Sequence, residues 1–421
     1  MSTICLNMIV KNEAAIIEET LANILEHVPL TYWVISDTGS SDDTPERIER
    51  FFAARGIKGE LHHHEWKHFG HNRQLALDAA KGKADYLFLF DADDRIYGDL
   101  GLDADTELNA DAYFLRMRGQ HDKNRFYTRR LMLKNDLPWQ WRGAVHEQLY
   151  LPPSAMRPNS QVLVDGDYYV VSGRFGARSQ NPQKYYDDAL MMERYFDEND
   201  DRDLCAQNAF FCGQSYRDAK MFDKAVEWYQ KSIGYCQKGS EQRRYTLMML
   251  AEQYKNLEQS EKAVCQWILA YDNSPHNAEA LVYLAEYFLG QGANLVAFEY
   301  AEKSLSLREP HPLTVIVANK TVYRYGPHNA YLRAALGLER YEQAYTAYKH
   351  LLQLPEANAK LNRYLLKVTL LEPMQALISQ DEPSERADIY RQIAAMEQLS
   401  EEDKVLQQQI LADRAKYSHL K

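Results

Sequence analysis

The sequence lacks the features that mark several classes of protein. No apolar run approaches the length of a membrane span, and the first residues have neither the basic start nor the apolar middle of a signal peptide. The five cysteines are odd in number and include no CxxC pair. This usage argues against a disulfide framework and against a zinc site. We therefore expect a soluble protein of the reducing cytoplasm.

Signatures of phosphate-binding and polyanion-binding proteins are also missing. No GxGxxG follows the first apolar segment and no GxxxxGK[ST] occurs, which argues against a dinucleotide-binding protein and an NTPase. The net charge of −11 provides no attraction to nucleic acid or anionic lipid. A chain of 421 residues with 45% hydrophobic content is too long for one ordinary core, so two or three globular domains are expected.

The most informative segment that is present covers residues 85–94. An apolar run from Tyr86 to Phe90 is followed by three carboxylates, Asp91, Asp93 and Asp94. Such a run is typical of a central parallel strand that is covered on both faces. The carboxylates would repel one another unless a cation lay between them, and Mg²⁺ or Mn²⁺ prefers such oxygen ligands. An Asp-rich turn that caps the next element is the alternative for this motif alone.

The N-terminal part alternates between strand and helix patterns. Strands are predicted at 4–10, 32–36, 61–65 and 86–90, with helices ending near 26, 54 and 81. This order predicts an α/β fold with a doubly wound, mostly parallel sheet. Polar residues follow three of the strands, namely Asn12 and Glu13, Asp37, and Asp91 with Asp93. Because parallel strands end at one edge of a sheet, these residues are expected to form one site.

Four of these segments together resemble a known family. Residues 7–13 (NMIVKNE), 34–44 (VISDTGSSDDT), 71–74 (HNRQ) and 91–94 (DADD) are similar in order and spacing to family 2 glycosyltransferases of the GT-A fold. The resemblance is strong over residues 3–100 and continues less clearly to about 175. It implies a Rossmann-like catalytic domain that binds a nucleotide-sugar.

The resemblance also implies roles for individual residues. Asp37 would contact the base or ribose, Arg73 would approach the nucleotide, and Asp91 to Asp93 would hold Mn²⁺ or Mg²⁺ on the diphosphate. Arg174 and Arg178 match a loop that closes over the donor, although an ordinary linker explains them equally well. The expected nucleotide-sugar-binding set is Asn12, Glu13, Asp37, Arg73, Asp91, Ala92, Arg174 and Arg178.

Residues 139–147 are the candidate acceptor half of the site. By the resemblance, Glu147 is the general base and His146 contacts the metal or a phosphate, beside Asp93 and Asp91 as metal ligands. Trp139 and Trp141 would stack on a sugar ring or fill the core. Two strand-like segments precede them, within residues 111–133. Arg129 and Arg130 on the second segment are interpreted either as a solvated sheet face or as groups near the donor phosphates.

From about residue 182 the pattern becomes wholly helical. Tyr216, Tyr254 and Tyr287 recur 38 and 33 residues apart within similar segments, close to the tetratricopeptide period of about 34 residues. Such repeats stack into a superhelix with a concave groove, which presents a surface to peptides or to a second copy of the chain. We expect a GT-A domain at 1–180, an all-α tetratricopeptide-like solenoid at 181–375 and capping helices at 376–421.

The combined pattern predicts an inverting, metal-dependent glycosyltransferase. The donor would be a UDP-linked sugar, and the acceptor a hydroxyl or thiol on a peptide or protein, because the layout resembles sublancin-type peptide S-glycosyltransferases. Synthesis of surface polysaccharide and modification of nucleic acid are alternatives, and the acidic charge argues against the second. A scaffold with an inactive transferase domain is a further alternative, which the intact set of Asp37, Arg73, Asp91 and Glu147 argues against.

Overall fold

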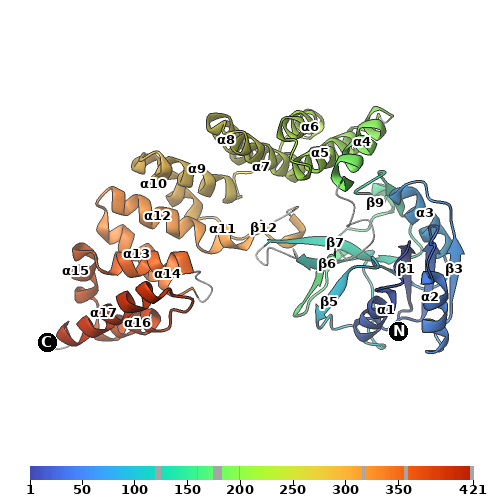
Figure 1. Ribbon diagram of the computed structural model, residues 1–421, viewed down its shortest axis with the longest axis horizontal. Coiled ribbons are helices and arrows are strands. Elements are labelled where there is room, and N and C mark those ends of the chain that lie inside the picture. The colour runs from blue at the N-terminus through green and yellow to red at the C-terminus, as the bar shows by residue number, and fades with distance from the viewer. Residues whose placement is uncertain are drawn as a thin grey trace. The chain divides into compact units, whose positions relative to one another are not determined.

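The computed structural model describes residues 1–118, 125–158, 160–173, 183–198, 200–314, 316, 318–354 and 359–417 (Figure 1). The chain forms two compact units. The first comprises Met1–Gln266 with Pro310–Asn319, and the second Trp267–Glu309 with Lys320–Lys421. The domain boundaries expected at residues 180 and 375 stay predictions.

The first unit contains a ten-stranded mixed sheet. Its strand order is β3 (Gly59–His63), β2 (Tyr32–Asp37), β1 (Ile4–Val10), β4 (Tyr86–Leu89), β7 (Arg125–Lys134), β6 (Ala112–Arg118), β11 (Tyr168–Val171) and β5 (Arg95–Gly98). In addition, β10 (Gln161–Leu163) pairs with β6, and β12 (Ala318–Asn319) pairs with β7. Strands β1 to β4 are parallel to one another, as the sequence predicts, whereas β7 is antiparallel to both β4 and β6.

Helices cover both faces of the parallel part of the sheet. Residues of α1 (Ile17–His27) and α2 (Thr44–Ala53) share a core with Phe88 and Phe90 on one face. On the other face, α3 (Phe69–Ala79) shares a core with Leu87 and Leu89. The apolar run of β4 is therefore buried on both sides, because alternate side chains enter different cores. A separate hairpin of β8 (Gln140–Arg142) and β9 (Gln148–Tyr150) contacts α3.

Helical repeats follow the sheet. The first unit includes α4 (Lys184–Asp197), α5 (Arg202–Asp218), α6 (Phe222–Tyr235) and α7 (Glu241–Asn256), and α8 (Ser260–Asn273) crosses the boundary between the units. The second unit contains α9 (Glu279–Gly290), α10 (Asn294–Leu305), α11 (Lys320–Arg324), α12 (Gly326–Gly337), α13 (Tyr341–Leu352), α14 (Ala359–Thr369), α15 (Glu372–Gln380), α16 (Pro383–Ala394) and α17 (Glu401–Tyr417).

The helices pair in the tetratricopeptide-like pattern that the sequence predicts. Helix α5 packs on α6, α9 on α10, and α12 on α13. Alanines such as Ala285, Ala297, Ala301 and Ala334 are fully buried between these helices, which allows the backbones to approach closely. Among the helices of the described residues, none is long and apolar enough to cross a membrane.

Candidate active site

The loops after β1 and β2 are tied together at the carboxyl edge of the sheet. Asn12 has a left-handed backbone conformation with φ of 55°. Its Oδ1 accepts a hydrogen bond from the Ser41 amide at 2.7 Å. The Glu13 amide donates to Thr44 Oγ1 at 2.8 Å. The structure therefore brings the two predicted residues after the first strand beside the turn that follows the second.

Asp37 organises that turn. Its carboxylate accepts hydrogen bonds from the amides of Gly39 and Ser40 at 3.1–3.2 Å. His63 Nδ1, on the neighbouring strand β3, lies 3.4 Å from Asp37 Oδ2. Only 4% of Asp37 is exposed. Asp37 thus shapes the loop at the predicted nucleotide position, and the ring of His63 is the more exposed group beside it.

The acidic segment after β4 is neutralised in part by two arginines. Asp91 Oδ1 accepts from Arg73 Nη2 at 2.5 Å and Asp91 Oδ2 accepts from Arg129 Nη2 at 3.0 Å. Arg129 Nη1 also donates to Asp94 Oδ2 at 3.1 Å. Asp94 is fully buried, and burial together with the charge of Asp91 raises its pKa to about 7.

Arg129 belongs to this cluster because β7 inserts antiparallel beside β4. The sequence left its role open between a solvated sheet face and the donor site. Arg130, the next residue, has its guanidinium over the Phe114 and Trp139 rings and bonds to Leu149 O and Gln161. The alternation of side chains along a strand could have indicated that the two arginines differ in role, because only one of two adjacent arginines can face Asp91.

Carboxylates on the other side of the cluster repel one another. Burial, followed by repulsion from Asp93 and Asp42, raises the pKa of Glu13 to about 7. Burial and the charge of Asp91 also raise the pKa of Asp93 above its ordinary value. A divalent cation fits this surplus of carboxylate charge. The described residues contain no group of three His, Cys, Asp or Glu side chains arranged as a metal centre, so such an ion would need phosphate oxygens as further ligands.

Ala92 and Gly173 show how closely the backbone packs around the acidic segment. Ala92 is buried, and its carbonyl oxygen accepts a hydrogen bond from the Thr20 hydroxyl of α1. A Cβ placed on Gly173 would lie 1.8 Å from the carbonyl oxygen of Asp93. Arg174 and Arg178, expected near the diphosphate, lie outside the described residues.

Arg73 connects the acidic segment to the predicted acceptor half of the site. Besides its bond to Asp91, its Nε donates to Glu147 Oε1 at 2.5 Å. The side chains of Arg73 and Glu147 are each only 11% exposed. The Trp141 ring lies 5.3 Å from the Arg73 guanidinium carbon. One buried guanidinium therefore joins residues that are 56 positions apart in sequence, at Asp91 and Glu147.

The two tryptophans occupy different environments. Trp139 is 2% exposed, and its Nε1 donates to Lys134 O at 3.0 Å within the core beneath α3. Trp139 is thus a core residue, and the interpretation that it stacks on a sugar is wrong. Trp141 is half-buried, and its backbone amide donates a 2.8 Å hydrogen bond to Gln74 Oε1 of α3.

The loop between β8 and β9 carries both His146 and Glu147. Phe69 at the start of α3 donates its amide to Ala144 O at 3.1 Å. A Cβ on Gly70 would lie 2.1 Å from Gly143 O, so α3 and this loop are in direct backbone contact. His146 stacks on the Phe211 ring of α5, with centroids 4.4 Å apart. Phe211 was not expected from the sequence. The sequence feature that could have indicated its role is its position directly after Phe210. Phe210 already fills the core of the repeats, so a second aromatic residue beside it needs another packing partner.

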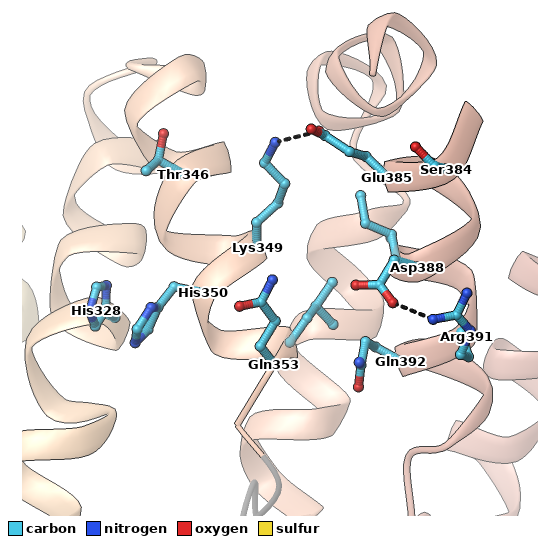
Figure 2. Close-up of a pocket in the computed structure, with 12 residues that line it drawn as sticks. His328, Thr346, Lys349, His350, Gln353, Ser384, Glu385, Asp388, Arg391 and Gln392 are labelled. Atoms are coloured by element: carbon cyan, nitrogen blue, oxygen red, sulfur yellow. Dashed lines mark hydrogen bonds and ion pairs between the residues drawn. The ribbon is translucent and has the colours of Figure 1, made fainter. Parts of the chain in front are cut away.

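A separate groove of about 670 Å³ lies in the second unit, among α12, α13 and α16 (Figure 2). Its charged side chains pair with one another, Lys349 with Glu385 at 3.4 Å and Arg391 with Asp388 at 2.7 Å. The rings of His328 and His350 stack with centroids 3.6 Å apart at one side of it. None of the predicted site residues lines this groove.

Comparison with known proteins identifies the family. A model of glycosyl transferase family 2 matches residues 5–217, just over half of the chain. The chain therefore belongs to glycosyl transferase family 2. Membership implies a nucleotide-sugar donor and an acceptor, and members commonly use divalent metals.

Several solved structures are similar to the helical region. MamA is 13% identical, with 42% of this chain and 92% of MamA covered and a TM-score of 0.32. A tetratricopeptide repeat protein from Parabacteroides merdae is 13% identical over 56% of this chain and 81% of its own, with a TM-score of 0.36. The C-terminal part of a TPR repeat-containing protein from Cytophaga hutchinsonii is 12% identical over 50% and 73%, also at 0.36.

Proposed function

We propose that this chain is an inverting, metal-dependent glycosyltransferase that moves a sugar from a UDP-linked donor to a hydroxyl or thiol of a peptide or protein. The observation that carries the proposal is the bridge from Asp91 through Arg73 to Glu147. It joins the segment expected to hold the donor diphosphate to the residue expected to activate the acceptor. The free cysteines agree with a reducing compartment such as the cytoplasm.

The donor half would be formed by the carboxyl edge of the sheet. Asp93 and Asp91 would hold Mn²⁺ or Mg²⁺, which would neutralise charge on the leaving diphosphate. The ring of His146, the third predicted ligand, stacks on Phe211 instead, and His146 is not a ligand in this proposal. Both oxygens of Asp91 already accept bonds from arginines, so Asp93 is the principal protein ligand in this proposal. Asn12, Glu13, Asp37, Arg73 and Ala92 would surround the nucleotide. Arg174 and Arg178, which lie outside the described residues, would contact the phosphates.

The acceptor half would be formed by the β8–β9 loop. Arg73 fixes Glu147 Oε1, and Oε2 has no hydrogen-bond partner among the described residues. The proton of the acceptor O–H or S–H would pass to Oε2 as the acceptor atom attacks the anomeric carbon. The bond from that carbon to the nucleoside diphosphate would break on the opposite face, which inverts the configuration. Trp141 would border the acceptor.

The donor site is tested by thermal unfolding with UDP-, GDP- and dTDP-sugars, with and without Mn²⁺. A donor at a hundred times its dissociation constant should stabilise the protein by about 2.7 kcal/mol. We expect stabilisation by a UDP-sugar only with metal, and none in Asp93→Ala. Asp105→Ala is the matched control, because Asp105 is an exposed aspartate of the same unit. Metal-independent binding, or full binding by Asp93→Ala, would reject the proposed donor site.

The base is tested by turnover. Glu147→Gln keeps the shape and the hydrogen bond from Arg73 but cannot take up a proton at neutral pH. It should bind donor normally and lose sugar transfer by about 10²-fold or more. A Gln variant with full activity would show that Glu147 is not the base. Mass spectrometry of peptide acceptors that carry Ser or Cys, and of glycan acceptors, then identifies the linkage atom.

A further inference from the structure

The loop that carries Glu147 has an unusual backbone. Gly143 and His146 both have positive φ, at 100° and 54°. Positive φ is easily adopted by glycine. It is uncommon for other residues, because their Cβ crowds the backbone in the left-handed region, although histidine adopts it more often than most. Such conformations persist where surrounding contacts hold them, and they cluster at functional sites. The strained residue here directly precedes the proposed base.

Helix α5 supplies contacts that hold this strained residue. The Phe211 ring stacks on the His146 ring with an interplanar angle of 11°. Gln207 Nε2 donates to the carbonyl oxygen of His146 at 3.3 Å. Gln207 and Phe211 are four residues apart and so lie on one face of the helix. Both the side chain and the backbone of His146 are therefore contacted by the same helical turn.

The start of α5 is also fixed to the hairpin. Asp201, the N-cap of α5, accepts hydrogen bonds from the amides of Asp203 and Leu204 through Oδ1. Its Oδ2 lies 3.3 Å from Arg142 Nη1 at the end of β8. Helix α3 also contacts the loop, through Gly70 and Arg73. The loop is thus held between a helix of the sheet domain and the first repeat.

Two adjacent phenylalanines divide their roles. Phe210 is 2% exposed and contacts the Tyr229 and Tyr245 rings of the repeats. Phe211 is half-buried and faces the loop instead. Packing of the repeats therefore accounts for Phe210 and leaves the orientation of Phe211 to be explained by His146.

We propose that Phe211 and Gln207 are positioning residues for the transfer reaction, because they hold His146 in its left-handed conformation and thereby aim the Glu147 carboxylate. Helix α5 of the first helical repeat would then help to position the general base, in addition to presenting a binding surface. This inference rests on the proposed role of Glu147 as the base. It predicts that damage to this contact reduces kcat and spares donor binding, because the groups proposed for the donor lie after β1, at the end of β2, on α3 and after β4.

The test compares Phe211→Ala and Gln207→Ala with the wild-type chain. A displacement of a reacting group by about 1 Å can lower turnover by about 10²-fold, so kcat should fall 10- to 100-fold in Phe211→Ala. The KM for the donor and the thermal shift with UDP-sugar and Mn²⁺ should change less than about twofold, which also shows that the variant is folded. Phe211→Tyr should restore kcat because it keeps the stacking ring. Gln214→Ala, on the next turn of α5, is the control and should behave as wild type.

Hydrogen exchange provides a second readout. Amides of residues 143–147 should exchange faster in Phe211→Ala than in the control, while those of β1 and β4 stay unchanged. Unchanged kcat in Phe211→Ala, or equal losses of kcat and donor affinity, would overturn the inference. A fully active Glu147→Gln would instead reject the proposed base, whatever the result at Phe211, so the two failures are distinguishable.

Discussion

Replacing Arg73 by methionine is expected to destabilise the first unit by about 3 kcal/mol. The Arg73 and Glu147 side chains are each 11% exposed, and removal of one partner from a buried ion pair costs about 3–5 kcal/mol. The lower end applies because Asp91 keeps its bond to Arg129. Glu147, in contrast, would lose the bond that fixes Oε1.

A double-mutant cycle separates this pair from other effects. Glu147→Met leaves Arg73 bonded to Asp91 and should cost about 1–3 kcal/mol. In Arg73→Met with Glu147→Met, no uncompensated charge remains at the pair, and both methionines can pack beside Trp141. The double variant should therefore lose less stability than the two single variants together, with a coupling energy of about 2 kcal/mol.

The assay is urea unfolding at neutral pH. Only the transition that shifts on addition of UDP-sugar and Mn²⁺ is compared, because the chain has two compact units and the whole curve is not two-state. With an m-value of about 3 kcal/mol per molar, Arg73→Met should lower the midpoint by about 1 M. An unchanged midpoint, or strictly additive single effects, would refute the idea that this bridge holds the two halves together.

Three further predictions concern other sites. Burial, followed by the charge of His350, lowers the pKa of His328 to about 4. Because its pKa in the unfolded chain is near 6.5, the free energy of unfolding decreases as pH falls from about 6.5 toward 4. Between pH 7 and 5 the wild type should lose about 1 kcal/mol more stability than His328→Gln, after allowance for partial exposure, and equal losses in thermal melting would contradict this. Gly70→Ala places a Cβ 2.1 Å from Gly143 O, so sugar transfer should fall sharply while donor binding is retained; normal turnover would show that the loop adapts. In Gly234→Ala the added Cβ has no atom within 4 Å, and the residue lies in helix α6. The variant should therefore be more stable by about 0.5 kcal/mol, measured as a higher melting temperature. A lower melting temperature would contradict the helical conformation of Gly234.

Much of the fold was predictable because it is encoded locally. The run from Tyr86 to Phe90 has no polar alternation, and β4 is indeed buried on both faces. The recurring tyrosines at 216 and 254 predicted the helix pairs. Asp91 is paired with arginine side chains, which the carboxylate-rich segment does not predict, and the divalent ion expected there stays a prediction.

Other features depend on contacts between distant segments. The position of Arg129 beside Asp91 follows from the antiparallel insertion of β7, which no local pattern reports. Trp139 has the same local signature as Trp141, but tertiary packing buries it. The stacking of His146 on Phe211 joins residues 65 positions apart. The predicted roles of the site residues themselves stay predictions.

Strand β12 has a consequence for synthesis of the protein. Ala318 and Asn319 pair with Phe126 and Arg125, the first residues of β7. At about 5–20 residues per second on the ribosome, the partner of this edge emerges roughly 10–40 s after β7 itself. During that interval the edge can template pairing with another nascent chain. A shortened version that stops at residue 266 would lack this pairing permanently, so a greater tendency to aggregate is expected for such a fragment.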